Sequence, residues 1–161
     1  MAKLERKAYA TYIDASFGGV SPIWFLIGKD IEDMSVELNP DLETRKNIIG
    51  ETTVVDNGYE PSMTADPYYA NPDDAIYEKI KDIAMKRLQG DACKTKILEV
   101  IVDPEDEGTH EAYTENVIVK PNSYGGDTSG FAIPFSINFD GGREEGTATI
   151  TKGSVEFTAK E

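Results

Sequence analysis

Hydrophobic residues recur at every second position along much of the chain, which is the period of a β-strand with one buried face. The pattern is clearest over residues 131–139, where Phe and Ile alternate with Ala, Pro, Ser and Asn. Pro134 cannot donate to a sheet ladder, so it indicates an edge or a bulge. The five apolar residues at 23–27 predict a short, fully buried strand. Weaker patterns predict further strands at 34–38, 48–55, 97–102, 113–119, 147–151 and 155–157.

One segment, residues 72–89, has the period of a helix instead. Asn71 is a good N-cap, Pro72 suits the first helical position, and Gly90 supplies the stop. Acidic residues near its start and basic residues near its end complement the helix dipole. Its apolar residues share one face, which we expect to pack on a sheet; they are Ile76, Ile80, Ile83, Ala84 and Leu88.

Turn signals divide the remaining chain into short strands. They lie at 56–58, 140–142 and 152–153, where Gly follows Asp, Asn, Gly or Lys. Strands do not alternate with helices, so the sequence predicts a mainly β fold. We expect an antiparallel β-sandwich or barrel with one flanking α-helix. A single domain spans 1–161, with an N-terminal arm at 1–20 and an extended loop or hairpin region at 39–70.

The acidic charge of the chain excludes several classes of function. Sixteen Lys and Arg stand against thirty Asp and Glu, for a formal net charge of -14. A broad nucleic-acid-binding face or an anionic membrane surface would require clustered basic residues. The single cysteine, Cys93, excludes an internal disulfide. The apolar run at 23–27 is too short to cross a bilayer, and we expect the protein to be made and kept in a cytoplasm.

Candidate chemistry is sparse, and the sequence predicts no enzyme, no catalytic residue, no metal and no cofactor. It holds neither a Gly-rich phosphate-binding signature nor H-E-x-x-H. His110, the only histidine, lies in an acidic, turn-like stretch and is predicted to be an exposed loop residue. Residues 103–108 imitate the start of a calcium loop, but its twelfth position is Thr114 instead of a bidentate Glu. We interpret this stretch as a solvated hairpin turn.

Three stretches of the sequence resemble the phage tail tube protein family, the bacteriophage major tail proteins. Their order and spacing carry the resemblance, which covers the chain from about Trp24 onward. The most extended pieces read IGKDIEDMSVELN at 27–39 and SYGGDTSG at 123–130. The other matching pieces are 46–52, 58–61, 66–70, 74–78, 87–90, 133–134, 139–141 and 145–147.

The resemblance implies a structural virion protein with a β-sandwich or barrel and one helix. Such subunits form hexameric rings that stack into a hollow tube, the conduit for DNA during ejection. The implied partners are further copies of the chain and the tape-measure, tail-tip and tail-terminator proteins, with DNA passing through without specific binding and no membrane contact. The implied location is the virion tail, with the host cytoplasm during assembly. The many carboxylates would then repel phosphate in the lumen, keep the subunit soluble before it polymerises, or both.

The resemblance also directs attention to two sets of surface residues. Charged residues within predicted strands are candidates for the lumen wall, namely Asp33, Glu37, Glu99 and Glu156. Basic residues and aromatic residues of the arm and of the 39–70 region are candidates for contacts between subunits. They are Arg6, Lys7, Arg45, Lys46, Tyr59, Tyr68 and Tyr69.

Two alternatives remain open at this point. A carbohydrate-binding β-sandwich module could use Tyr68 and Tyr69 with Asn71 as a platform, although an extended segment would turn the two rings to opposite sides. A small hydrolase could use paired acids, with His110 as the first residue to test.

Overall fold

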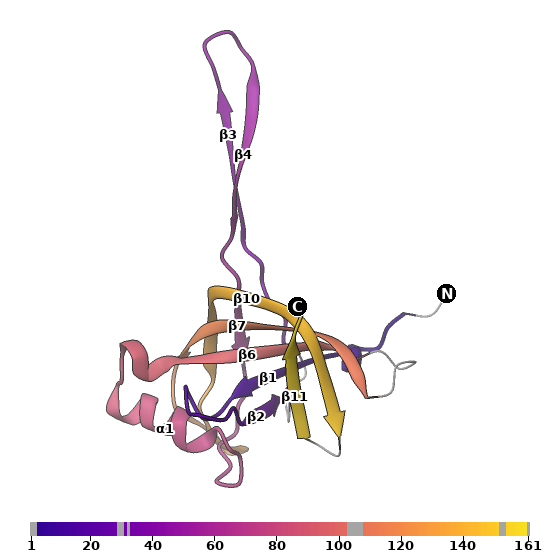
Figure 1. Ribbon diagram of the computed structural model, residues 1–161. Coiled ribbons are helices and arrows are strands. Elements are labelled where there is room, and N and C mark those ends of the chain that lie inside the picture. Colours follow the sequence, from indigo (N-terminus) through magenta and orange to yellow (C-terminus); the bar gives the residue numbers. More distant parts are fainter. Residues whose placement is uncertain (1–2, 29–30, 32, 103–107, 152–153, 161) are drawn as a thin grey trace.

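A strongly curled antiparallel sheet forms the body of the molecule, and one short helix packs against one of its faces (Figure 1). The computed structural model describes residues 3–28, 31, 33–102, 108–151 and 154–160. In chain order the elements are η1 (Arg6–Ala8), β1 (Tyr9–Asp14), β2 (Trp24–Ile27), β3 (Pro40–Lys46), β4 (Thr52–Tyr59), β5 (Ser62–Ala65), α1 (Tyr77–Lys86), η2 (Gly90–Cys93), β6 (Lys94–Ile101), β7 (Thr109–Pro121), β8 (Gly125–Asp127), β9 (Gly130–Ala132), β10 (Phe135–Thr151) and β11 (Ser154–Ala159).

The main sheet has the strand order β11-β10-β7-β6-β1-β2, and its neighbours pair antiparallel. The first residues of β10 also pair with β5, while its last residues pair with β11. Two small two-stranded sheets, β3-β4 and β8-β9, complete the described part. The predicted mainly β, antiparallel class with one flanking helix is confirmed, and its form is a curled half-barrel.

Each face of the curled sheet carries its own hydrophobic cluster, because successive residues of a strand point to opposite faces. Ile13 belongs to the larger cluster, which also takes in Ile76 and Ile80 from the helical region. Tyr12, its neighbour in β1, belongs to the smaller cluster on the inner face of the curl. The buried members of the smaller cluster are Tyr12, Leu98, Val100, Ala112 and Ala148.

The turn predicted at 140–142 is wrong, because β10 runs through it without a break. The register with β7 shifts between Phe139 and Gly141 and again between Gly141 and Glu144. Gly141 (φ 95°) and Gly142 (φ 71°) have backbone conformations that favour glycine, so the strand bends here instead of reversing. The local signal is that of a turn, but β7 is long enough to pair with both halves of the bent strand.

The strand predicted at 48–55 is confirmed only over its second half, 52–55, which belongs to β4, and the turn predicted at 56–58 is wrong. The chain instead forms a β3–β4 hairpin whose turn is centred on Ile48 and Ile49, where Asn47 Oδ1 accepts the N–H groups of Ile49 (3.1 Å) and Glu51 (2.9 Å). Gly58 (φ 93°) lies at a bulge within β4. The hairpin stands away from the curled sheet, and every residue of β3 is exposed (Figure 1).

The helix α1 is shorter at both ends than the predicted 72–89. Asn71 caps no helix, because its side chain accepts the N–H of Asp73 (3.0 Å) in the turn before α1. Arg87 takes a left-handed conformation (φ 52°) and ends the helix before Gly90 is reached. The predicted apolar face is confirmed by the burial of Ile80 and Ile83.

Three further differences concern exposure and pairing. Residues 23–27 form an edge strand instead of a fully buried one, with Leu26 52% exposed. Residues 34–38 show the predicted alternation at Met34 (buried) and Val36 (half-buried), but within the described residues they form no regular strand and contribute one β-bridge, from Glu37 to Ser62. His110 is buried within β7, so the prediction of an exposed loop residue is wrong.

The turn predicted at 152–153, and all of the turn predicted at 103–108 except Gly108, lie outside the described residues. Within the part of the chain that the structure describes, no helix is long and apolar enough to cross a membrane.

Candidate functional site

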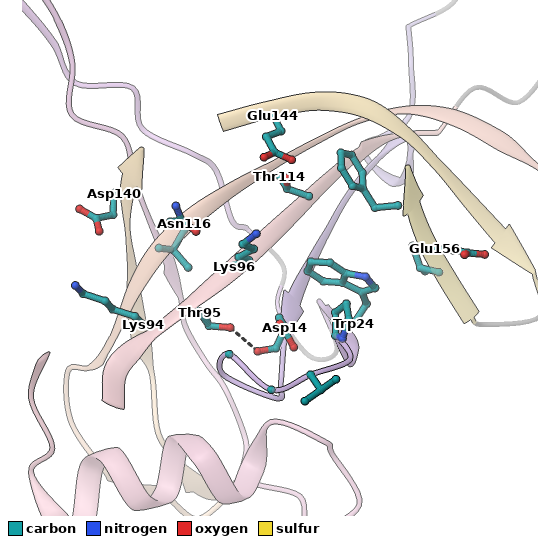
Figure 2. A pocket seen from close by; sticks show the side chains of 17 residues that line it. Asp14, Trp24, Lys94, Thr95, Lys96, Thr114, Asn116, Asp140, Glu144 and Glu156 are labelled. Atoms are coloured by element: carbon teal, nitrogen blue, oxygen red, sulfur yellow. Dashed lines mark hydrogen bonds between the residues drawn. The ribbon is translucent and has the colours of Figure 1, made fainter. Parts of the chain in front are cut away.

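A trough of about 920 Å³ follows the inner face of the curled sheet (Figure 2). Trp24 of β2 stands on one side of it and Phe157 of β11 lies on the other, and both pack on the smaller hydrophobic cluster. Lys96 of β6, Thr114 of β7 and Glu144 of β10 form part of its polar floor. The trough is therefore bounded by the two end strands of the sheet, and it combines apolar walls with a polar floor.

Some of the charges around the trough are already satisfied within the chain. Asp14 Oδ1 accepts the N–H groups of Ser16 (2.9 Å) and Ile23 (3.1 Å), so this buried carboxylate shapes the connection between β1 and β2. Lys94 Nζ lies 3.3 Å from a carboxylate oxygen of Asp91. By contrast, no ion pair within the described residues involves Lys96, Asp140 or Glu144. These three side chains are available for a partner.

A buried ionic cluster lies on the opposite face of the sheet. Arg143 Nη1 donates to Glu99 Oε1 (2.7 Å) and to Glu115 Oε1 (3.1 Å). The hydroxyl of Tyr9 donates to the other oxygen of Glu99 (2.7 Å), and the N–H of Gly141 donates to Glu115 Oε2 (3.2 Å). The cluster joins β1, β6, β7 and β10 and positions the bend of β10.

The titration of this cluster is shifted by its surroundings. Burial, followed by the negative charge of Glu99, raises the pKa of Tyr9 far above its ordinary value of 10.0. Burial opposes the charged form of Arg143, but its hydrogen bond and charge interaction with Glu99 raise the guanidinium pKa overall. Tyr9 therefore stays a neutral donor, and Arg143 stays a cation.

The four predicted lumen acids differ in their accessibility. Only 10% of the Glu99 side chain is exposed and its charge is matched by Arg143, so Glu99 presents no bare carboxylate. Asp33 and Glu37 are exposed beside β5. Glu156 is exposed on β11 between Val155 and Phe157, which pack on the smaller cluster, and it is one of the residues that line the trough (Figure 2). A lumen position for these acids stays a prediction.

Of the three aromatic residues predicted to contact other subunits, Tyr68 is buried. It is 5% exposed, its ring meets that of Phe135 edge-on (centroids 5.6 Å apart), and its hydroxyl donates to Asp74 Oδ2 (3.2 Å). A surface contact through Tyr68 is therefore ruled out for the folded chain. Tyr69 is half-buried, with its ring close to Gly130, and Tyr59 is 62% exposed at the base of the hairpin.

The predicted basic contact residues lie in two places. Arg6 donates to the carbonyl oxygens of Tyr9 (2.7 Å) and Met34 (3.0 Å), which ties the N-terminal arm to the body. Lys7 pairs with Glu5 on the exposed arm. On the hairpin, Arg45 pairs with Glu43 (3.2 Å), and Lys46 is exposed next to the turn.

The apolar tip of the hairpin was missed by the sequence patterns. Ile48 is 104% exposed and Ile49 73%, although both belong to a β-branched run that predicts a strand. The signal that could have located the turn is Asn47, whose side chain commonly closes a turn on the residues that follow it, together with Gly50. Two large apolar side chains at the tip of a projecting hairpin are typical of an interaction surface.

Among the described residues, no group of three or more His, Cys, Asp or Glu side chains could hold a metal ion. The trough and the hairpin tip are the two candidate binding surfaces.

Comparison with solved structures identifies the fold over nearly the whole chain. A sheath/tube terminator of an extracellular contractile injection system, PVC, aligns with a TM-score of 0.52 and 11% identity, covering 99% of each chain. The tail of an empty GTA particle, refined with C6 helical symmetry, aligns with a TM-score of 0.55 and 13% identity, covering 98% of this chain and 100% of the other. The tube-terminating cap of the anti-feeding prophage aligns with a TM-score of 0.51 and 14% identity, covering 99% and 93%.

The chain has the fold of these tail and tube-terminator proteins. No protein-family model and no curated protein sequence matches it. Because the sequence identities are only 11% to 14%, the similarity to these structures is a similarity of fold. It extends over 98% or 99% of this chain and over 93% to 100% of the others.

Proposed function

We propose that this protein is a structural subunit of a phage-like tail, and specifically the major tail protein that forms the tube. The observation that carries the proposal is the full-length likeness to a tail protein and to two proteins that terminate tubes. One of these relatives in fold was solved with C6 symmetry, which supports six copies per ring. Stacked rings would then form a conduit for DNA.

The surface of the single chain also favours assembly. A two-stranded hairpin is at best marginally stable in water on its own. Here β3 is exposed along its whole length, and the hairpin ends in Ile48 and Ile49. Within the described residues, β2 and β11 also end the sheet with one unpaired edge each. Neighbouring copies would cover these surfaces and stabilise the hairpin.

The net charge of -14 fits a tube that conducts DNA. A carboxylate wall repels phosphate and so prevents the polymer from sticking to the bore. Asp33, Glu37 and Glu156 are the proposed wall acids, because each is exposed on the surface. The proposed partners are further copies and the tape-measure, tail-tip and terminator proteins, in the virion tail and, during assembly, in the host cytoplasm.

Negative-stain electron microscopy of the concentrated protein, over a range of salt and with tail-tip proteins as initiators, tests this function. We expect hollow tubes of uniform width. Dispersed monomers that persist with the initiators present would contradict the proposal.

A tube terminator is the second candidate, because two of the three similar structures are a terminator and a terminating cap. A terminator would form single rings that bind tube ends and stop growth, whereas a tube subunit would add rings without limit. The length distribution of the particles over time separates the two.

The carbohydrate-binding alternative loses its platform, because Tyr68 is buried and cannot stack on a sugar. We expect no binding to a glycan array by the monomer.

A further inference from the structure

We propose that the trough of one subunit receives the hairpin tip of a second copy, with Ile48 and Ile49 packing between Trp24 and Phe157. The inference rests on the proposed function in that it requires copies of the chain to assemble. It goes further by naming both surfaces of one contact.

The donor surface cannot be covered by its own subunit. β3 has seven residues, so at ~3.3 Å per residue the hairpin reaches roughly 23 Å from its base. It points away from the curled sheet (Figure 1), and its tip residues Ile48 and Ile49 are fully or largely exposed. Burying these two side chains removes apolar surface from water, and only another molecule can provide the cover.

The acceptor surface is the trough in the body of the chain, with its apolar walls and polar floor. Val20, on the β1–β2 connection, is 105% exposed at the rim of the trough. Trp24 and Phe157 stand on its two sides and are only half-buried, although they pack on the buried smaller cluster. The volume of about 920 Å³ is large enough for several side chains. An apolar hairpin tip would extend the smaller cluster and exclude water from it.

Charges on the two surfaces are complementary. Lys46, directly before the turn, makes no ion pair within the described part of the chain, and it can meet Glu144 or Asp140 of the trough. Glu51, directly after the turn, is exposed and can meet Lys96, which projects into the trough (Figure 2). The order of charges along the hairpin therefore fixes the orientation in which the tip enters.

Donor and acceptor lie on different parts of one subunit, so the contact is heterologous. When the tip of one copy has docked into the trough of another, the first copy still has an empty trough and the second still has a free tip. Such an interface continues into a ring or a filament.

Disulfide trapping tests the contact directly. In a Cys93→Ser background, protein carrying Ile48→Cys is mixed with protein carrying Val20→Cys and oxidised under assembly conditions. We expect cross-linked dimers at a yield about tenfold above that of the control mixture of Ile48→Cys with Tyr124→Cys, because a disulfide needs Cα atoms closer than about 7 Å. Tyr124 is exposed but lies outside the trough, which makes it a matched control.

Trp24, the only tryptophan, gives a second readout. Its fluorescence should shift to shorter wavelength when the wild-type protein assembles, since a docked tip excludes water from the trough. Ile48→Asp should abolish the shift and leave the unfolding midpoint of the monomer unchanged, whereas Leu38→Asp, an exposed change away from the tip, should retain the shift.

The outcomes separate the two proposals. Tubes or rings without the Val20 cross-link and without a Trp24 shift would overturn the contact and leave the assembly function standing. Absence of any assembly, even with initiators, would overturn both.

Discussion

Arg143 of β10 and Glu99 of β6 form an ion pair (2.7 Å) although β7 lies between their strands in the sheet. The register of β10 with β7 shifts twice just before Arg143, and the N–H of Gly141 in this bulged stretch donates to Glu115 in the same cluster (3.2 Å). The same nitrogen, Arg143 Nη1, also forms an ion pair with Glu115 of β7 (3.1 Å). One cation therefore holds three adjacent strands at the point where the sheet bends.

We predict that Arg143→Met destabilises the fold, because it leaves two buried carboxylates without their cation. The expected loss is about 2 to 3 kcal/mol, below the ~3–5 kcal/mol for breaking a fully buried pair, since 43% of the Arg143 side chain is exposed. Denaturant unfolding followed by Trp24 fluorescence measures it. Arg45→Met, which breaks an exposed pair on the hairpin, should change stability by less than about 0.5 kcal/mol. Equal effects of the two changes would contradict this account.

The raised pKa of Tyr9 predicts a loss of stability at alkaline pH. Tyr9 ionises near its ordinary value of 10.0 in the unfolded chain but stays protonated in the fold, so its contribution is complete below pH 10 and declines above it. The decline amounts to ~1.4 kcal/mol per pH unit. Between pH 9 and 11, the free energy of unfolding should therefore fall less steeply with rising pH for Tyr9→Phe than for the wild type. Ile80→Val, which weakens the core without removing a tyrosine, should keep the wild-type slope.

The end of α1 offers a stabilising substitution. Arg87 has a left-handed backbone (φ 52°) that is costly for a residue with a side chain and that glycine adopts freely. Arg87→Gly should raise the free energy of unfolding by about 0.5 kcal/mol after the entropy of the unfolded chain is included. Gly90→Ala is the opposite test, because Gly90 (φ 69°) lies in the same backbone region, and it should cost about 1 kcal/mol. A destabilised Arg87→Gly protein would show that the arginine side chain matters more than its backbone.

At Gly146, β10 and β11 leave no room for a side chain. A Cβ there would press on the carbonyl oxygen of Thr158 and lie 2.7 Å from the ring of Phe157. Gly146→Ala should therefore push β11 away from β10, at a cost of about 2 to 3 kcal/mol, with faster amide exchange over 154–159. Gly28→Ala is the matched control, since a Cβ at Gly28 meets nothing within 4 Å, and it should stay within about 0.5 kcal/mol of the wild type. Unchanged exchange in Gly146→Ala would contradict the predicted displacement.

Local periodicity predicted much of the fold. The alternation at Phe135 and Ile137 and the apolar face at Ile80 and Ile83 are both confirmed, because each reflects contacts that one element makes with the core. Periodicity carries no information on which strands pair. The cluster of Glu99 and Arg143 depends on the strand order, so it could not be found from the sequence.

Local turn signals were a weaker guide wherever tertiary pairing overrides them. The Asp-Gly-Gly at 140–142 and the Asp-Asn-Gly at 56–58 became bulges, since in each case the opposite strand continues past them. Tyr68 was expected at the surface because it is an aromatic residue of the 39–70 region, which was predicted to be an extended loop or hairpin. Its burial depends on Phe135, which is distant in sequence. For the same reason His110 was placed in a loop although β7 begins at Thr109.

The order of strands in the sheet also has a consequence for biosynthesis. β1 is made before its partner β6, with which it pairs through Tyr9 opposite Ile101, and the described sheet is completed only when β11 pairs with β10. Sheets dominated by such distant pairings fold slowly and expose their edges meanwhile. The β3–β4 hairpin, by contrast, needs only local pairing. A nascent chain can therefore form its hairpin long before its β11 is made, whereas the main sheet must wait for its later strands.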